Sequence, residues 1–568
     1  MRDIVLKWAL KNAIDHNGKA LEKAVISKAI GEQPDLRNNM LQLKRVVEEV
    51  VKEINQLTYK QQKNRLREYA PELLHEKVTK ERELPPLPKG EMGKVVTRIP
   101  PEPSGYMHLG HAMSFTINFF YAKKYDGKIW LRFEDTDPRK VYKKYYRNFK
   151  QGLHWLGIDW DYEKNNSDSM SQYYMYAKRL VELGQAYICT CHVEELRKKR
   201  SEGVECVHRI RDSDTNLREL DHLLSGIDDG EKRVLRLKGD MKSKNKVMRD
   251  PVLLRTIRHR HPLTGNKYSV WPTYDFAVAI EDAICNITHV LRSSEFAPRE
   301  ELQNRIRTLL DLINPIFITY ARFNFKGTPV SKRKIRELIS KGVVPGWDDP
   351  RLTTIDGIKR RGILPEAIKE FTIKYAALTH SKKEYDWNLL FPINRRLLDP
   401  KSKRYFFVSN PVKLHVKESP HRTILLNSHP QEKMGQREIT VNGEFYISRQ
   451  DVETINKNQV IRLMGVYNIV IEHINQSDIE ASYHSEELVS KMPKIQWVTN
   501  ENIKANIQIP DLLYRNGDFN ENSLRILHGF AEKPAGNIVV GEIIQFERVG
   551  FCRLDSKNSI LNFILAHK

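Results

Sequence analysis

Two histidines three residues apart could contact a phosphate group. His108 and His111 stand in the tetrapeptide His-Leu-Gly-His, where an apolar run gives way to a helical pattern. Free backbone N–H groups at the start of a helix that follows a strand bind anions. Gly110 lets a nucleotide lie close to the backbone. Taken alone, this tetrapeptide is more often a surface pair of histidines.

A second cluster of polar residues lies in the segment Ser331-Lys332-Arg333. The preceding Gly327 and Pro329 predict a loop. Cations on such a loop can stabilise the negative charge of a triphosphate as it reacts. The alternative for a basic run by itself is a solvated face.

The residues Cys189, Cys191, Cys206 and His208 form two tight pairs of metal-ligand types. Three thiolates and one imidazole make a tetrahedral set suited to structural zinc. The whole chain has only five cysteines, so the grouping of three of them is informative. The alternative is two reduced pairs packed in a small subdomain.

The elements that would position these residues alternate in type along the chain. Residues 1–83 have helical periodicity, and the proline- and glycine-rich stretch 84–94 suits a linker. From 95 to 320 strands and helices alternate, which predicts a Rossmann-like, doubly wound parallel sheet. A polar insertion interrupts it at about 190–268, after which we expect the parallel sheet to resume.

The last third of the chain has a β texture. Between 385 and 568, short apolar runs are separated by polar turns, and this pattern predicts one or two antiparallel β-barrels. The fold class is therefore α/β, with a helical N-terminal domain, a Rossmann-like domain carrying an insertion, and C-terminal barrels.

Composition favours a polyanionic partner. The chain has 568 residues, of which 94 are Lys or Arg and 72 are Asp or Glu, so the formal net charge is +22. Such an excess of cations favours binding to nucleic acid, because each neutralised phosphate releases counterions. The sequence has no run of eighteen apolar residues, and its few cysteines suit a reducing compartment, so we expect a cytoplasmic protein that does not enter the membrane.

Together, the histidine tetrapeptide and the Ser331-Lys332-Arg333 segment resemble the signatures of class I aminoacyl-tRNA synthetases. RIPPEPSGYMHLGHA (98–112) is similar to the segment with the HIGH tetrapeptide, and TPVSKRK (328–334) is similar to the KMSKS loop. The second match departs from the consensus at Pro329 and Val330. PPEPSG and LRFEDTDP resemble the glutamyl and glutaminyl branch. The likeness extends over nearly the whole chain, through the segments WDDPRLTT, GEFYIS and GEIIQFERVGFCRLD. Over this length the sequence resembles the archaeal form of the glutamyl-tRNA synthetases.

The resemblance implies a ligase that uses ATP with Mg²⁺ in two steps. Glutamate attacks the α-phosphate and releases pyrophosphate, and the glutamyl group then passes to the 3′-terminal adenosine of a tRNA. The catalytic residues would be His108, His111 and Lys332. ATP would be bound by the residues of the two signatures: His108, Gly110, His111, Ser331, Lys332 and Arg333.

The same resemblance implies a glutamate pocket formed by Arg98, Glu134, Tyr274 and Arg292. Glu134 has the sign to bind an ammonium group, and the two arginines offer forked donors to carboxylates. The glutaminyl branch places a small uncharged residue where this chain has Arg292, so glutamate is favoured. The alternative for Arg292 is a structural salt bridge to Glu295 or Glu300.

The domains acquire roles from the resemblance. Residues 321–384 would carry the KMSKS-like loop and a helical region that contacts the tRNA stem, and 385–568 would bind the anticodon. Some glutamyl-tRNA synthetases carry zinc in the insertion, which the cysteine pattern resembles. We expect a monomer with tRNA(Glu) as its partner, and tRNA(Gln) stays open. The alternatives are a glutaminyl-tRNA synthetase, an enzyme that charges both tRNAs, a silent tRNA-binding paralogue, and a glutamyltransferase acting on tRNA bases.

Overall fold

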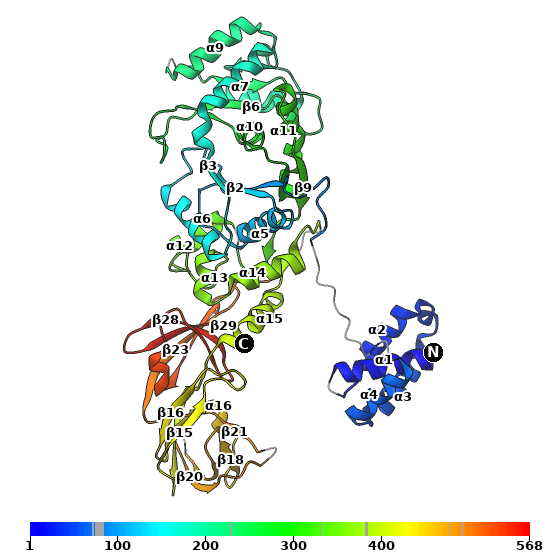
Figure 1. Cartoon of the computed structure of the whole chain (residues 1–568), viewed down its shortest axis with the longest axis vertical. Helices are drawn as coiled ribbons and strands as arrows, with labels where there is room; N and C mark the ends of the chain where they lie inside the picture. Colours follow the sequence, from blue (N-terminus) through cyan, green and yellow to red (C-terminus); the bar gives the residue numbers. More distant parts are fainter. Residues whose placement is uncertain are drawn as a thin grey trace. The chain divides into compact units, whose positions relative to one another are not determined.

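The computed structural model (Figure 1) describes most of the chain. The described residues are 1–16, 18–70, 73, 84–227, 230–329, 331–380, 384–475, 477–489 and 492–568. The end of the expected helical domain and Val330 lie outside them. The chain divides into two units, Met1–Glu83 and Leu84–Lys568. Among the described residues, no helix combines the length and the apolar composition needed to cross a membrane.

The first unit is helical, as its periodicity predicts. Its described helices are α1 (Arg2–Asp15), α2 (Glu22–Glu32), α3 (Met40–Asn55) and α4 (Tyr59–Tyr69), with a short 3₁₀ turn at Pro34–Asn39. Helix α3 buries Leu43, Val47 and Ile54 on one face, since apolar residues three or four apart share a side of a helix. Thr58 caps α4 in a reciprocal capping box with Gln61.

The second unit begins with three parallel strands. The elements are β1 (Val96–Ile99), α5 (Leu109–Lys124), β2 (Lys128–Phe133), α6 (Lys143–Trp155) and β3 (Tyr162–Asn165). Strand β2 pairs in parallel with β1 on one side and with β3 on the other. The two crossover helices let sequential strands lie parallel, so the predicted Rossmann-like alternation is confirmed here.

Two further parallel strands lie beside β1. Strand β8 (His289–Ser293) pairs in parallel with β9 (Ile316–Tyr320), and α10 (Tyr274–Ile284) and α11 (Ala297–Leu309) flank β8 in sequence. The Thr288 backbone N–H donates to the Val96 carbonyl at 3.1 Å and joins the two sets of strands. The strand order is thus β3-β2-β1-β8-β9. The order reverses between β1 and β8, and crevices at such switch points bind ligands.

The insertion contains an antiparallel sheet that the sequence pattern did not predict. Its strands, in the order β4-β5-β6-β7, are Ala186–Cys189, Val234–Leu237, Val252–Thr256 and Val270–Pro272. The expectation that the parallel sheet resumes near residue 268 is wrong, because Val270–Pro272 pairs antiparallel with β6. A short buried run has no periodicity that distinguishes the two kinds of sheet. Helices α7 (Met170–Glu182), α8 (Val193–Glu202) and α9 (Ser213–Ser225) belong to the same region.

The C-terminal part forms two seven-stranded sheets that each close nearly into a barrel. One has the order β12-β27-β28-β29-β23-β26-β13, and the other β21-β18-β19-β20-β14-β17-β22. The edge strands β12 (Arg404–Tyr405) and β13 (Phe407–Ser409) are separated by one residue, as are β21 (Lys494–Ile495) and β22 (Trp497–Thr499). Both edges of each sheet therefore belong to one continuous segment, which requires the sheet to curl upon itself.

Most barrel pairs are antiparallel, as predicted, but each barrel also contains parallel pairs, among them β23–β29 and β14–β20. The remaining barrel strands are β14 (Pro411–Lys417), β17 (Glu444–Ser448), β18 (Val460–Leu463), β19 (Asn468–Ile474), β20 (Asp478–Ser485), β23 (Asn502–Pro510), β26 (Leu524–Glu532), β27 (Ile543–Phe546), β28 (Gly550–Lys557) and β29 (Leu561–His567).

A helical segment lies between the parallel sheet and the barrels in sequence. It comprises α12 (Lys332–Ser340), α13 (Ile355–Arg361), α14 (Pro365–Phe371) and α15 (Trp387–Leu398). Leu513, from the C-terminal part, is fully buried in one apolar cluster with Ile335 and Leu338 of α12. The expected loop ends at Ser331, because α12 begins at Lys332, and this helix is packed directly against the C-terminal part.

Candidate active site and candidate metal centre

A cavity of about 310 Å³ lies at the switch point of the parallel sheet. Eight of the residues expected to bind ATP or glutamate line it: Arg98, His108, Gly110, His111, Glu134, Tyr274, Arg292 and Lys332. They come from loops and elements far apart in the sequence. The fold therefore brings the two signatures and the four expected glutamate residues to one cavity.

The two histidines lie at the N-terminus of α5. His108 is the residue before the helix, its ring stacks on that of His111 with 3.7 Å between ring centroids, and its backbone N–H donates to His111 Nδ1 at 3.3 Å. Burial, with the nearby Lys332 and Arg322 cations, lowers the pKa of His108 to about 3. Both imidazoles are accordingly neutral near pH 7 and can contact a phosphate only through hydrogen bonds.

The Lys332 ammonium group extends toward the loop that follows β1. Its Nζ donates to Ser104 Oγ at 2.7 Å and lies 3.9 Å from Glu102 Oε2. A Cβ added at Gly105 would lie 2.6 Å from Lys332 Cδ, so a larger residue there would displace the Lys332 side chain. Ser331 is the N-cap residue of α12 and Arg333 is exposed. Neither of these two lines the cavity.

Thr353 ties the two signatures together. Its backbone carbonyl accepts from the Leu109 N–H at 2.8 Å, and its hydroxyl donates to the Pro329 carbonyl at 3.1 Å. Thr353 is fully buried. The segment WDDPRLTT therefore fixes the spacing between the histidine helix and the SKRK loop.

Buried charges form the other end of the cavity. Asp282 Oδ1 accepts from Arg132 Nη1 at 2.7 Å and from Arg98 Nε at 3.3 Å. Burial by itself would raise the pKa of Asp282, but the two guanidinium groups lower it below its ordinary value. Ionised Asp282 thus holds Arg98 in place by one edge of its guanidinium group.

Several charged atoms at this end are buried and have no hydrogen-bond partner among the described residues. Those on residues that line the cavity are Arg98 Nη1, Arg292 Nε, Arg292 Nη2 and Glu134 Oε1; behind them, Arg132 Nε, Arg132 Nη2 and Asp282 Oδ2 also lack a hydrogen-bond partner. Leaving buried charged groups unpaired costs about 1–3 kcal/mol each or more. Native proteins tolerate such groups where a ligand pairs with them. Their signs match a ligand that offers negative charge to two cations and positive charge to one carboxylate.

Glu134 and Tyr274 have perturbed acidities. Burial raises the pKa of Glu134 to about 7, against the opposing effect of Arg132 and Arg98. Burial also raises the pKa of Tyr274, so its phenol keeps its proton and can donate it. Tyr274 is the first residue of α10, and its ring centroid lies 5.6 Å from that of Phe296.

Arg292 is not held by the acidic residues that the sequence offered as partners. Its Nη1 donates to Gln303 Oε1 at 2.8 Å, whereas Glu295 pairs with Arg322 at 3.5 Å. Its guanidinium carbon lies 4.5 Å from the centroid of the Phe317 ring. A structural ion pair with Glu295 or Glu300 is therefore not the arrangement that the structure has.

Sequence reasoning missed several residues of the site. Glu102, Arg322 and Tyr320 line the cavity, and Asp282 anchors Arg98 from behind it. Arg322 follows the last parallel strand, where the rule for switch-point crevices could have found it. Asp282 lies inside an apolar helix, and a buried acid in such a helix is a signal for a buried cation.

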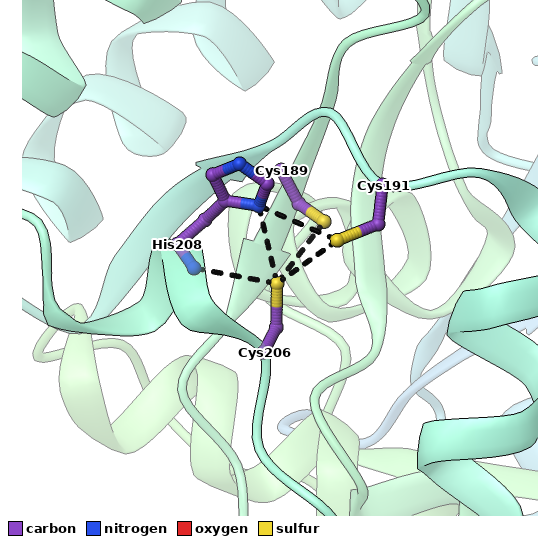
Figure 2. Close-up of side chains that lie close together, drawn as sticks. All are labelled: Cys189, Cys191, Cys206 and His208. Atoms are coloured by element: carbon purple, nitrogen blue, oxygen red, sulfur yellow. Dashed lines mark hydrogen bonds between the residues drawn. The ribbon is translucent and has the colours of Figure 1, made fainter.

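The cysteine and histidine side chains of the insertion point toward a common centre (Figure 2). The four ligand atoms of Cys189, Cys191, Cys206 and His208 lie within 4.8 Å of one another. Cys206 Sγ is 3.5 Å from Cys189 Sγ, 3.4 Å from Cys191 Sγ and 3.2 Å from His208 Nδ1. Zn–S bonds of about 2.3 Å in a tetrahedron place sulfurs about 3.8 Å apart, so a small expansion would admit the ion.

The surroundings of this cluster affect the acidity of its thiols and the orientation of its imidazole. Burial raises the pKa of Cys189, and burial together with the neighbouring thiols raises that of Cys191 to about 12. Thr190 Oγ1 lies 3.2 Å from His208 Nε2, the ring nitrogen that faces away from the cluster. Such an outer partner fixes the ring orientation of a metal-binding histidine.

Most of the second unit matches known protein families. Residues 94–400 match the family described as class I tRNA synthetases (E and Q), catalytic domain. Residues 402–485 and 494–555 match two anti-codon binding domain families of the same synthetases. The first match covers more than half of the chain.

Curated relatives match over the full length. A protein of Nitrosopumilus maritimus named "Glutamate--tRNA ligase" is 39% identical over 567 residues, 99% of each chain. Proteins of the same name from Pyrococcus furiosus and Korarchaeum cryptofilum are 39% and 38% identical, and each match covers 100% of this chain and 99% of the relative.

Proposed function

This chain belongs to the class I tRNA synthetases for glutamate and glutamine, and we propose that it ligates L-glutamate to tRNA(Glu) with ATP. The first step would form glutamyl adenylate and release pyrophosphate. The second would transfer the glutamyl group to the 3′-terminal adenosine of the tRNA. The full-length relatives that are named glutamate–tRNA ligases support the choice of glutamate over glutamine.

The observation that carries the proposal is the set of unpartnered charged atoms in the cavity. Among the described residues, Arg98 Nη1 and two nitrogens of Arg292 have no hydrogen-bond partner; Glu134 Oε1 has none either, although it lies 3.7 Å from Arg132 Nη2. Glutamate has two carboxylates and one ammonium group, so it pairs all three residues. Glutamine has one carboxylate and would leave a desolvated guanidinium facing its neutral amide, which costs about 1–3 kcal/mol.

The ATP end of the cavity would act mainly by alignment and charge stabilisation. The α-carboxylate oxygen of glutamate attacks the α-phosphorus, and the bond to the bridging oxygen of pyrophosphate breaks. The neutral imidazoles of His108 and His111 and the N-terminus of α5 would hydrogen-bond the phosphates. Lys332 would neutralise charge on the departing pyrophosphate, with Mg²⁺ arriving with ATP. Ser331 and Arg333 can contribute only if the start of α12 moves, since neither lines the cavity.

The partner of the C-terminal barrels would be the anticodon arm. The matches of 402–485 and 494–555 to anti-codon binding domains support this role. The helical segment from α12 to α15 would then lie along the tRNA stem. The net charge of +22 favours the long polyanion that this arrangement requires.

We also propose that the Cys189, Cys191, Cys206 and His208 cluster binds structural zinc. The donor set is closed, with three sulfurs and one nitrogen, and it leaves no position for a reacting water. The ion would supply folding energy to the insertion rather than chemistry.

An aminoacylation assay tests the proposed function. The purified chain is incubated with ATP, Mg²⁺ and labelled glutamate or glutamine, and with purified tRNA(Glu) or tRNA(Gln). We expect glutamate to be esterified to tRNA(Glu) and glutamine to be esterified to neither tRNA. Charging by glutamine would support the glutaminyl alternative, glutamate on both tRNAs would establish a non-discriminating enzyme, and no charging at all would contradict the proposal.

The role of Lys332 can be tested separately. The change Lys332→Ala should lower the rate of ATP–pyrophosphate exchange by roughly 10²–10³-fold, because one preorganised charge contact is lost. Arg333→Ala is the matched control, since that exposed cation is adjacent but does not line the cavity. Equal losses in the two variants would contradict the assignment to Lys332 alone.

A further inference from the structure

Behind Arg292 lies a hydrogen-bonded chain that does not line the cavity. Gln303 of α11 accepts from Arg292 Nη1 through its Oε1 at 2.8 Å, and its Nε2 donates to Asp275 Oδ1 at 3.0 Å. Asp275 Oδ2 in turn accepts from Arg299 Nη1. Gln303 is fully buried and Arg292 is 5% exposed. The chain therefore connects α10, α11 and β8: its inner members, Arg292 and Gln303, are closed to solvent, whereas the Arg299 side chain at its outer end is 40% exposed.

The orientation of the Gln303 amide is fixed by its two neighbours. Asp275 is ion-paired with Arg299 and accepts hydrogen bonds at both oxygens. A guanidinium group only donates. If the amide were reversed, its NH₂ group would face the donors of Arg292 and its oxygen would face a carboxylate. Gln303 is thus locked with its oxygen toward Arg292.

All the groups that hold Arg292 directly are neutral. Besides the Gln303 amide, they are the ring of Phe317, with its centroid 4.5 Å from the guanidinium carbon, and the ring of Phe296 at 6.0 Å. Aromatic faces and an amide oxygen stabilise a cation without cancelling its charge. The Nε and Nη2 atoms stay without a partner among the described residues. The full positive charge of Arg292 is therefore available to a ligand.

We infer that Gln303 is a positioning residue that sets glutamate specificity: it orients Arg292 toward the side-chain carboxylate of the substrate and leaves its charge uncancelled. This inference rests on the proposed function of the cavity. A glutamate at position 303 would have nearly the same shape but would pair with Arg292 itself and compete with the substrate. A side chain without an acceptor would leave Arg292 free to turn away.

The test compares Gln303→Glu with Gln303→Met in ATP–pyrophosphate exchange, with tRNA(Glu) present. We expect Gln303→Glu to raise the KM for glutamate roughly tenfold or more, because an internal carboxylate replaces the charge-assisted contact. Gln303→Met should raise it less, roughly three- to tenfold, since the charge remains but its direction is lost. The KM for ATP should stay within about twofold in both variants, because Gln303 holds Arg292 and Asp275, which are not among the residues expected to bind ATP.

The preference for glutamate over glutamine gives a second readout. Measured as the ratio of their kcat/KM values, it should fall most in Gln303→Glu, whose Arg292 no longer faces the substrate as an unpaired cation. Asn304→Asp is the matched control. It places the same charge one residue further along α11, where Asn304 accepts from Arg307 Nη2 at 2.8 Å, and neither residue lines the cavity. This control should leave both KM values nearly unchanged.

The outcomes separate the inference from the proposed function. If the unaltered protein shows no exchange with glutamate, the proposed function fails. If it is active but Gln303→Glu keeps the KM for glutamate within about twofold, the positioning role is overturned. A parallel rise in the KM for glutamate and for ATP, or an equal rise in Asn304→Asp, would also overturn it, because a purely structural role predicts these results. Thermal unfolding of each variant confirms that the compared proteins are folded.

Discussion

At the scale of single residues, the cavity is lined by buried charged side chains of which some atoms have no hydrogen-bond partner among the described residues. Arg98 is held from behind by ionised Asp282, and Arg292 by the neutral Gln303, so both direct free donors into the cavity. Glu134 supplies the opposite sign. These charged groups lose their bound water when the protein folds, which destabilises the empty site. A ligand of matching charge pairs with them when it binds and offsets that loss.

The acidity of Glu134 leads to a pH dependence. Burial raises its pKa to about 7, so the side chain is neutral below that pH and ionised above it. Only the ionised form pairs with the α-ammonium group of the substrate. The KM for glutamate should therefore fall as the pH rises from about 6 to about 8, around the value given for Glu134.

The measurement is the KM for glutamate at a series of pH values, with the KM for ATP as an internal reference. The change Glu134→Gln should raise the KM and remove its dependence on pH, since a neutral amide does not titrate. A pH profile that survives in this variant would assign the dependence to another group.

At the scale of elements, the strongest local prediction concerns the insertion. Protein purified without added metal should contain about one equivalent of zinc per chain. The change Cys206→Ser should remove the metal and lower the unfolding temperature, because Cys206 contacts all three other ligands.

The matched control for the metal centre is Cys285→Ser, a buried cysteine outside the cluster. It should keep its zinc even if it loses some stability. Metal-free, fully active protein, or equal metal content in the two variants, would leave the four ligand-type residues as packing residues only.

Deleting the C-terminal part would not test tRNA binding alone, because this part also packs against α12 and α13. Deleting residues 385–568 would remove Leu513, which is buried against Ile335 and Leu338 of α12. It would also remove Asp555, which accepts from Arg360 Nε at 2.9 Å and from Arg360 Nη2 at 2.7 Å. Such a deletion would disturb the SKRK segment along with tRNA binding, so point changes on the barrels are the better probe.

At the scale of the whole molecule, net charge gives the clearest prediction. An excess of 22 positive charges over a chain of 568 residues should make tRNA binding strongly dependent on salt. Between about 50 and 200 mM KCl we expect the KM for tRNA to rise roughly tenfold or more. The KM for glutamate should change much less, because buried pairs are screened weakly. Equal salt effects on the KM for tRNA and on the KM for glutamate would contradict an electrostatic role for the excess of cations in tRNA binding.

The order of elements could be predicted from the sequence to a large extent. The alternation from Val96 onward and the resemblance of the two signatures located the parallel sheet and the residues that line its crevice. The antiparallel strands of the insertion could not be predicted, because runs as short as Val270–Pro272 carry no usable periodicity. The exposed position of Arg333 was missed for a related reason, since composition does not tell which cation of a basic run faces a cavity.

The contacts behind the site were beyond sequence reasoning. Asp282 and Gln303 reach their arginines across the fold, and no spacing rule connects residues in different elements. The alternative considered for Arg292 was a salt bridge to an acidic neighbour in sequence, whereas the structure provides a buried amide from α11. This difference matters for function, because a neutral amide, unlike a carboxylate, does not compensate the positive charge of Arg292.

The most direct test of the central claim is the amino-acid preference of Arg292→Ala. The assay measures kcat/KM for glutamate and for glutamine, with Arg98→Ala as the contrasting variant. Loss of a charge-assisted contact of about 1.5–3 kcal/mol should lower the value for glutamate roughly ten- to a hundredfold. Glutamine should lose less or gain, while Arg98→Ala should impair both amino acids alike. An unchanged ratio of glutamate to glutamine in Arg292→Ala would contradict the account, and Arg292 would then serve only to stabilise the fold.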